Sequence, residues 1–155
     1  MENLKTNFSL PWSKAARNLL VAFIVLAWFG FADASYLTIK HYLAAPVPCS
    51  LIGNCEAVLT SKYSMFFGIP VALFGSLYYL TLLILSLIYL DAKKSLVLAW
   101  LFRLSWVGVA FSLWFIFVQL FILKEICLYC MFSAVTSISL FLLAFKILRN
   151  KVVAA

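Results

Sequence analysis

Charged residues are scarce in this sequence: they make up 11% of its 155 residues, and five of them are acidic. Hydrophobic residues account for 66%, and the mean hydropathy is +1.11. A soluble domain of this length does not need so much apolar surface. The composition therefore excludes a soluble fold and predicts an integral membrane protein with a single domain.

The sequence also lacks internal repeats, low-complexity tracts and lipidation signals. Its net charge of +7 would indicate nucleic-acid binding if the basic residues shared one polar face. They cluster instead at the ends of apolar runs, which is typical of the flanks of membrane spans. Aromatic residues reach 17%, as lipid-facing and interfacial surfaces favour.

Four apolar runs are long enough to cross a bilayer of about 30 Å at about 1.5 Å of helix per residue. The predicted fold is an all-α bundle of four transmembrane helices, in a single membrane domain of residues 1–155. The spans are expected at about residues 18–38, 67–90, 101–123 and 126–148. Pro70 fits the first turn of the second span, where no N–H group is needed.

One long polar connection, residues 40–63, separates the first two spans. Residues 56–64 are predicted to form a short half-helix lying on the membrane, with Asn54 as its N-cap. The single histidine, His41, is interpreted as an interfacial residue rather than a catalytic one.

The first span has a second interpretation and one costly residue. Ala32, Asp33 and Ala34 resemble a signal-peptide cleavage site, but the helical pattern continues beyond them, and cleavage would leave an odd number of spans. Asp33 is costly within a span unless it faces protein or water. We therefore expect it in one of those settings or near the outer interface.

The basic residues are distributed unequally between the two ends of the predicted bundle. Both termini and the turn at residues 91–95 share one side, which carries nine of the twelve basic residues; the other side carries three. Because basic residues are enriched in cytoplasmic loops, both termini are expected in the cytoplasm. All four cysteines then lie at the extracytoplasmic face, where disulfides form and persist.

The four cysteines form two pairs in different settings. Cys127-Leu128-Tyr129-Cys130 opens the last apolar run, so its sulfur atoms lie one turn apart at a helix N-terminus, where the pKa of a thiol falls. Cys49 and Cys55 lie on the long polar connection. We interpret the four as one electron path. A framework of structural disulfides and a zinc site are the alternatives.

Thiol–disulfide exchange passes electrons between cysteine pairs that touch. A soluble reductant can reach the loop pair, whereas Cys130 is expected about 4.5 Å deeper than Cys127. A lipid-soluble two-electron acceptor, a quinone, is therefore predicted to meet Cys130, while Cys127 exchanges with the loop. Cys127, Cys130, Ala134 and Ser137 share a small, mildly polar helix face that suits a planar ring.

The order of these features resembles the vitamin K epoxide reductase family in its bacterial form. The matching residues are Cys49, Cys55, Ser61, Gly68-Ile69-Pro70, Gly75, Cys127 and Cys130, together with Tyr36-Leu37-Thr38. The resemblance covers about residues 30–137. Two features of the vertebrate enzymes are missing: a Tyr four residues after the second motif cysteine is Ala134 here, and the second span contains no Asn. These departures favour a plain quinone over vitamin K epoxide.

The resemblance implies a bundle around a quinone of the ubiquinone or menaquinone type. It implies that Cys49/Cys55 accept electrons from a thioredoxin-like (DsbA-like) partner and pass them to Cys127/Cys130 and then to the quinone, which generates disulfides. Ser61 is expected to donate a hydrogen bond to a quinone carbonyl. Further quinone contacts are expected at Tyr63, Phe67, Phe74 and Ala134.

Location and partner follow from the same resemblance. The expected location is the bacterial inner (plasma) membrane, with the cysteines on its outer side. Some bacterial relatives carry a fused thioredoxin-like domain, whereas this sequence ends at Ala155. The thiol partner is therefore expected to be a separate protein.

Other functions fit some of the same residues. A DsbB-type quinone-linked oxidase also has four spans and two cysteine pairs, but its C-x-x-C lies on the first outer loop of a different fold. A non-catalytic membrane subunit would hold structural disulfides, which have reduction potentials below about −300 mV. A carrier moving electrons outward would need a cytoplasmic cysteine, which the predicted topology does not provide.

Overall fold

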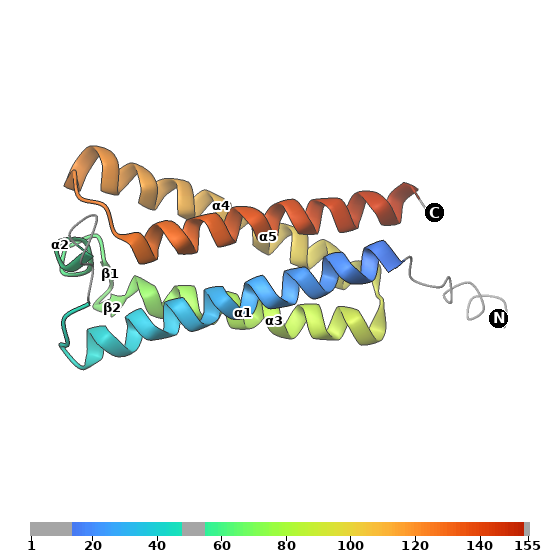
Figure 1. Ribbon diagram of the computed structural model, residues 1–155, viewed down its shortest axis with the longest axis horizontal. Coiled ribbons are helices and arrows are strands. Elements are labelled where there is room, and N and C mark those ends of the chain that lie inside the picture. Colours follow the sequence, from blue (N-terminus) through green and yellow to red (C-terminus); the bar gives the residue numbers. More distant parts are fainter. Residues whose placement is uncertain (1–13, 48–54, 154–155) are drawn as a thin grey trace, which may run out of the picture.

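Four long helices form a bundle in which each helix runs opposite to its neighbours (Figure 1). The computed structural model describes residues 14–47 and 55–153. The long helices are α1 (Lys14–Tyr42), α3 (Val71–Ala92), α4 (Ser95–Phe117), which continues into the π-helical segment η1 (Val118–Leu123), and α5 (Leu128–Val153). They provide apolar spans of 22 to 29 residues, so the chain is a multi-pass membrane protein.

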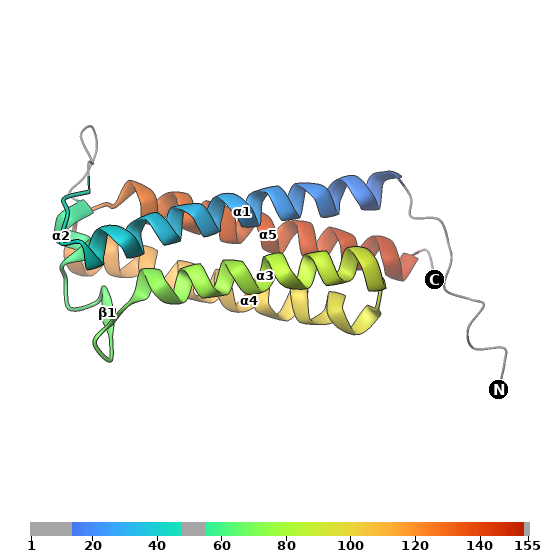
Figure 2. The ribbon, with the colours of Figure 1, turned by 90° about the horizontal axis from the view of Figure 1, so that it is seen from below.

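The helices pack unequally around the bundle (Figure 2). Helix α1 lies between α3 and α5, and α4 packs mainly against α5, whereas the contact between α3 and α4 is sparse. Large apolar side chains fill the interior, and others, such as Trp28, Trp106 and Phe111, point outward and are exposed. An apolar exterior on four long helices is the surface that lipid covers.

The predicted four-span fold is confirmed, but the helix ends differ from the expected ones. Helix α1 extends past both expected ends because long basic side chains such as Lys14 and Lys40 can lie along a helix and still reach water. Helix α3 begins at Val71 instead of residue 67, because the preceding residues form a hairpin. Helix α4 begins six residues early, at Ser95, and α5 begins two residues late, at Leu128.

The short half-helix exists but is smaller than expected. Helix α2 (Cys55–Leu59) covers five residues instead of residues 56–64. A turn follows it, in which the Ser64 N–H donates to the Ser61 carbonyl (3.0 Å). Asn54, the expected N-cap, lies outside the described residues.

A two-stranded hairpin leads from this turn into α3. Strand β1 (Met65–Phe66) pairs antiparallel with β2 (Ile69–Pro70). Phe67 and Gly68 join them, both with positive φ (51° and 79°), as a two-residue hairpin turn requires. Pro70 therefore lies in extended backbone (φ −64°, ψ 133°) as the N-cap of α3, not in its first turn as expected.

The two ends of the bundle differ in charge and in chemistry. Helix α2, the hairpin and the α4–α5 connection lie together at one end (Figure 1). This end holds the described cysteines Cys55, Cys127 and Cys130. Its described basic residues are Lys40, Lys62 and Lys124, whereas the opposite end carries Lys14, Arg17, Lys93, Lys94, Lys146, Arg149 and Lys151.

Candidate active site

Cys127 is the residue immediately before α5, and its backbone is fixed on both sides. Its carbonyl accepts a hydrogen bond from the Met131 N–H (3.0 Å), which makes it the N-cap of the helix. Its own N–H donates to the Gln119 side-chain oxygen (2.8 Å). Gln119 is 1% exposed and belongs to η1, so the end of one span holds the start of the next.

The surroundings of Cys127 favour its thiolate. The Cys130 thiol donates a hydrogen bond to the Cys127 sulfur, which lowers the pKa of Cys127 below its usual value. The backbone N–H groups of Cys130 and Tyr129 lower that pKa further, whereas burial and the Asp33 charge act in the opposite direction. A thiolate is the attacking form in thiol–disulfide exchange, so Cys127 is suited to be the exchanging sulfur.

Helix α2 brings a loop cysteine to the Cys127 side of the motif. Cys55 and Cys127 are 1% and 0% exposed and form one buried cluster with Val58. Cys55 is disulfide-bonded, whereas Cys127 and Cys130 are free thiols. Cys49, the other loop cysteine, lies outside the described residues.

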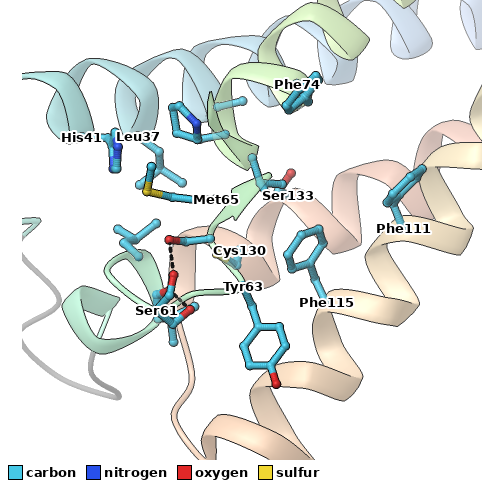
Figure 3. A pocket seen from close by; sticks show the side chains of 18 of the residues that line it. Leu37, His41, Ser61, Tyr63, Met65, Phe74, Phe111, Phe115, Cys130 and Ser133 are labelled. Carbon is cyan, nitrogen blue, oxygen red and sulfur yellow. Dashed lines mark hydrogen bonds between the residues drawn. The ribbon is translucent and has the colours of Figure 1, made fainter. Parts of the chain in front are cut away.

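Cys130 faces a different space. A cavity of about 1010 Å³ lies at this end of the bundle (Figure 3). Cys130, Ser133, Ala134 and Ser137 line it from α5, and Asp33, Phe74, Tyr78, Phe111 and Phe115 line it from the other spans. Cys127 is not among its described lining residues. Both motif cysteines therefore contact the cluster around Cys55, with Cys127 buried inside it and Cys130 packed against it, but among the described residues Cys130 is the one of the two that also lines the cavity.

The sequence order of these elements is that of a known family. Residues 21–145 match the sequence profile of the vitamin K epoxide reductase family. The chain belongs to the vitamin K epoxide reductase family. This membership makes it an oxidoreductase with quinone and disulfide chemistry, as expected from the four cysteines. It also sets aside the DsbB-type alternative, which has a different fold.

Proteins of the vitamin K epoxide reductase family act with quinones, and the cavity fits such a molecule. Its volume is at the upper end of ordinary ligand pockets, which span about 300–1,000 Å³. Asp33 Oδ2 is a buried polar atom without a hydrogen-bond partner among the described residues, and the buried Tyr78 hydroxyl lies near Ser137 but forms no hydrogen bond of good geometry with a described residue. A buried polar atom is costly unless something satisfies it. The Tyr78 hydroxyl is a donor that a quinone carbonyl can satisfy.

Four of the five expected quinone contacts line the cavity: Ser61, Tyr63, Phe74 and Ala134. Phe67 does not, because the hairpin turn carries it outward and leaves it 91% exposed. The Ser61 hydroxyl donates to the Val58 carbonyl (2.7 Å), so its proton is used within the turn that ends α2 (Figure 3). This hydrogen bond favours a structural role for Ser61 over donation to a quinone.

The sequence does not predict the hydrogen bonds that two polar residues, Tyr79 and Gln119, form in the site. The Tyr79 hydroxyl donates to the Ser133 carbonyl (2.8 Å) and lies within hydrogen-bond distance of the hydroxyls of Ser133 (2.9 Å) and Ser137 (3.2 Å). It thus joins α3 to the wall of the cavity. Gln119 holds the start of α5. Both are polar groups inside apolar runs, and such residues mark functional sites in membrane proteins.

Proposed function

We propose that this member of the vitamin K epoxide reductase family oxidises thiols to disulfides and transfers the electrons to a membrane quinone. The carrying observation is that Cys127 is buried in one cluster with Cys55, whereas Cys130, which packs against that cluster, also lines the cavity. Cys127 is then suited to receive electrons from the loop pair, and Cys130 is suited to deliver them to a molecule in the cavity.

The proposed path has three exchanges. A thioredoxin-like partner reduces the Cys49/Cys55 disulfide and becomes oxidised itself. The reduced loop pair then attacks the Cys127–Cys130 disulfide through a mixed disulfide between Cys55 and Cys127. The reduced motif finally gives two electrons to the quinone as its own disulfide forms again. Each step moves two electrons, so thiols and disulfides balance throughout.

The chain's own residues have separate tasks at the quinone. Tyr63, Phe74 and Ala134 bound the space that a ring would occupy, with Ala134 leaving room beside Cys130. The Tyr78 hydroxyl is available to donate to a quinone oxygen. The family membership supports a quinone, and the absence of an Asn in the second span and of a Tyr at position 134 supports a plain quinone as the acceptor.

We place this chemistry on the extracytoplasmic side of a bacterial inner membrane. The described basic residues support that orientation, because seven, with Lys151 of α5 included, lie at the end that includes the α3–α4 turn, three lie at the cysteine end, and Arg103 lies within α4. An oxidising compartment favours stable product disulfides. Both termini would then lie in the cytoplasm.

Trapping of the inter-pair disulfide tests the proposed path. In a Cys130→Ser variant, the Cys127 thiolate can attack the Cys49–Cys55 disulfide at Cys55 and release Cys49 as a free thiol, but no Cys130 thiol is present to resolve the product. A Cys55–Cys127 mixed disulfide should therefore persist in this variant when it is isolated without reductant. Mass spectrometry of peptides digested without reduction identifies the joined residues. The matched Cys127→Ser variant should trap no disulfide between the loop pair and the motif. Accumulation of a Cys130 mixed disulfide in that variant would reverse the two roles.

A single-turnover measurement tests the acceptor. Protein in lipid nanodiscs, reduced at Cys127 and Cys130, should reduce an added ubiquinone or menaquinone analogue stoichiometrically. The Cys130→Ser variant should lose this step. A non-catalytic subunit with structural disulfides would show no quinone reduction in either protein.

A further inference from the structure

Asp33 is an acidic side chain within a transmembrane helix, and nothing in the proposed path so far uses it. It lies in α1, and its Oδ2 atom is buried without a hydrogen-bond partner in the described part of the chain. An acidic residue within a span is costly unless it faces protein or water. A partly buried carboxyl group with one oxygen unpartnered among the described residues therefore suggests a function in the cavity that it lines.

The position of Asp33 connects it to the redox pair. Asp33 and Cys130 line the same cavity. The carboxylate lies within electrostatic reach of Cys127 and Cys130, and of Tyr79 on α3. Helix α1 packs against both α3 and α5, and Asp33 and Cys130 therefore line the cavity from two helices that are in contact.

The chemistry of the proposed function requires a proton carrier at this place. Oxidation of a dithiol by a quinone moves two electrons and two protons. In the reacting form Cys127 is a thiolate, which its surroundings favour, and the Cys130 thiol still holds a proton when the disulfide forms. The serine and tyrosine hydroxyls of the cavity do not ionise near neutral pH. Glu56, exposed on α2, and His41, near the end of α1, also line the cavity, but Asp33 is the one of these three that acts electrostatically on both motif cysteines.

We infer that Asp33 accepts the proton of the Cys130 thiol during quinone reduction and delivers it to an oxygen of the reduced quinone. This inference rests on the proposed function. The S–H bond of Cys130 breaks, the Cys127–Cys130 disulfide forms, and two electrons pass to the quinone. One proton reaches the product through Asp33. The second comes from water at the cavity mouth and replaces the proton that Cys127 released earlier.

An isosteric substitution separates proton transfer from packing. Asp33→Asn keeps the shape but cannot accept a proton. Since general acid–base groups contribute about 10²–10⁴-fold, we expect single-turnover quinone reduction to slow by about 10²-fold. Binding of the quinone analogue, measured by fluorescence quenching, and exchange between the two cysteine pairs should remain within about twofold. Asp33→Glu, which retains a carboxyl group, should recover at least part of the rate.

A readout without quinone checks that the charge acts on the motif. Because the Asp33 carboxylate raises the pKa of Cys127, the thiolate absorbance of Cys127 should titrate at lower pH in Asp33→Asn. The variant should be at least as thermally stable as the natural protein, since an unpaired buried carboxyl group is removed. Asp91→Asn is the matched control, because Asp91 is exposed at the opposite end of the bundle.

The outcomes distinguish this inference from the proposed function. If the natural protein and Asp91→Asn reduce the quinone and Asp33→Asn does so equally fast, Asp33 carries no proton and the inference is wrong. It is also wrong if the rate falls only in proportion to lost folded protein, or if Asp33→Glu is as slow as Asp33→Asn. If the natural protein itself reduces no quinone, the proposed function falls, and the inference falls with it.

Discussion

Cys127 and Cys130 carry the same side chain one helical turn apart, yet their surroundings give them different chemistry. Cys127 is an N-cap with backbone N–H groups directed at its sulfur, and it lies beside Cys55. Cys130 belongs to the helix and faces the cavity. The Cys130 thiol also donates a hydrogen bond to the Cys127 sulfur and stabilises its negative charge. The different chemistry of the two cysteines therefore depends partly on their contact with each other.

The thiolate of Cys127 should depend on its donor at position 130. In a chain with Cys49 and Cys55 replaced by Ser, the pKa of Cys127 should lie below that of an ordinary thiol, so Cys127 should keep its negative charge to lower pH than an unperturbed cysteine does. Cys130→Ala removes the donor and should move the titration to higher pH. Cys130→Ser keeps an O–H donor and should move it less. Ultraviolet thiolate absorbance against pH measures both, and identical curves would contradict the assignment.

At the scale of elements, the site depends on how closely α1 and α3 approach each other. Gly30 of α1 faces the Tyr79 ring, and a Cβ added there would lie 2.5 Å from Tyr79 Cε1. The same tyrosine reaches Ser133 and Ser137 on α5 through its hydroxyl. The missing side chain of Gly30 therefore allows α1, α3 and α5 to pack closely around the Tyr79 side chain, within two turns of Cys130 on α5.

Gly30→Ala should displace the Tyr79 ring and break its hydrogen bonds. Overpacking of this kind costs about 1–3 kcal/mol, so the thermal unfolding temperature in detergent should fall. Gly75→Ala provides the control, because its added Cβ would meet only the Ala34 Cβ, at an ordinary 3.5 Å. Equal melting temperatures for the two variants would show that Tyr79 can move without loss.

The sequence was sufficient for the long elements and insufficient for the short ones. Apolar runs predict spans because lipid requires about twenty apolar residues in a helix. The hairpin of residues 65–70 has two residues in each strand, which is too short for an alternating pattern to appear. The sequence therefore predicts Phe67 on the second span and in the quinone site, whereas the hairpin turn directs its side chain away from the bundle and leaves it exposed. The π-helical segment η1 is not predicted from the sequence either, because a π-helical turn leaves the run of apolar residues unchanged.

The candidate site shows the same division. The order and spacing of the cysteines are visible in the sequence, as is the small face of the last span. Contacts between different elements are not visible in the sequence. They include the hydrogen bond between Gln119 and Cys127 and the hydrogen bond between Tyr79 and Ser133. Asp33 was visible as an anomaly within a span, but its neighbours became known only from the packing of α1 against α5.

At the scale of the whole molecule, the proposed orientation can be tested with introduced cysteines. In a chain with all four native cysteines replaced by Ser, Thr60→Cys places an exposed thiol at the α2 end, and Ser95→Cys places one at the α3–α4 turn. A membrane-impermeant maleimide should label the first in intact cells and the second only after permeabilisation. The reverse pattern would place the redox pairs in the cytoplasm.

The arrangement of the cysteines in two separate pairs has a kinetic consequence. On the proposed path, the inner pair holds two electrons as Cys127 and Cys130 thiols once the loop pair has passed them on and closed its own disulfide again. An enzyme that stores electrons internally does not need donor and acceptor bound at once. On the proposed path, the partner can leave before a quinone arrives, and turnover should follow ping-pong kinetics, with the chain alternating between a loaded and an unloaded form.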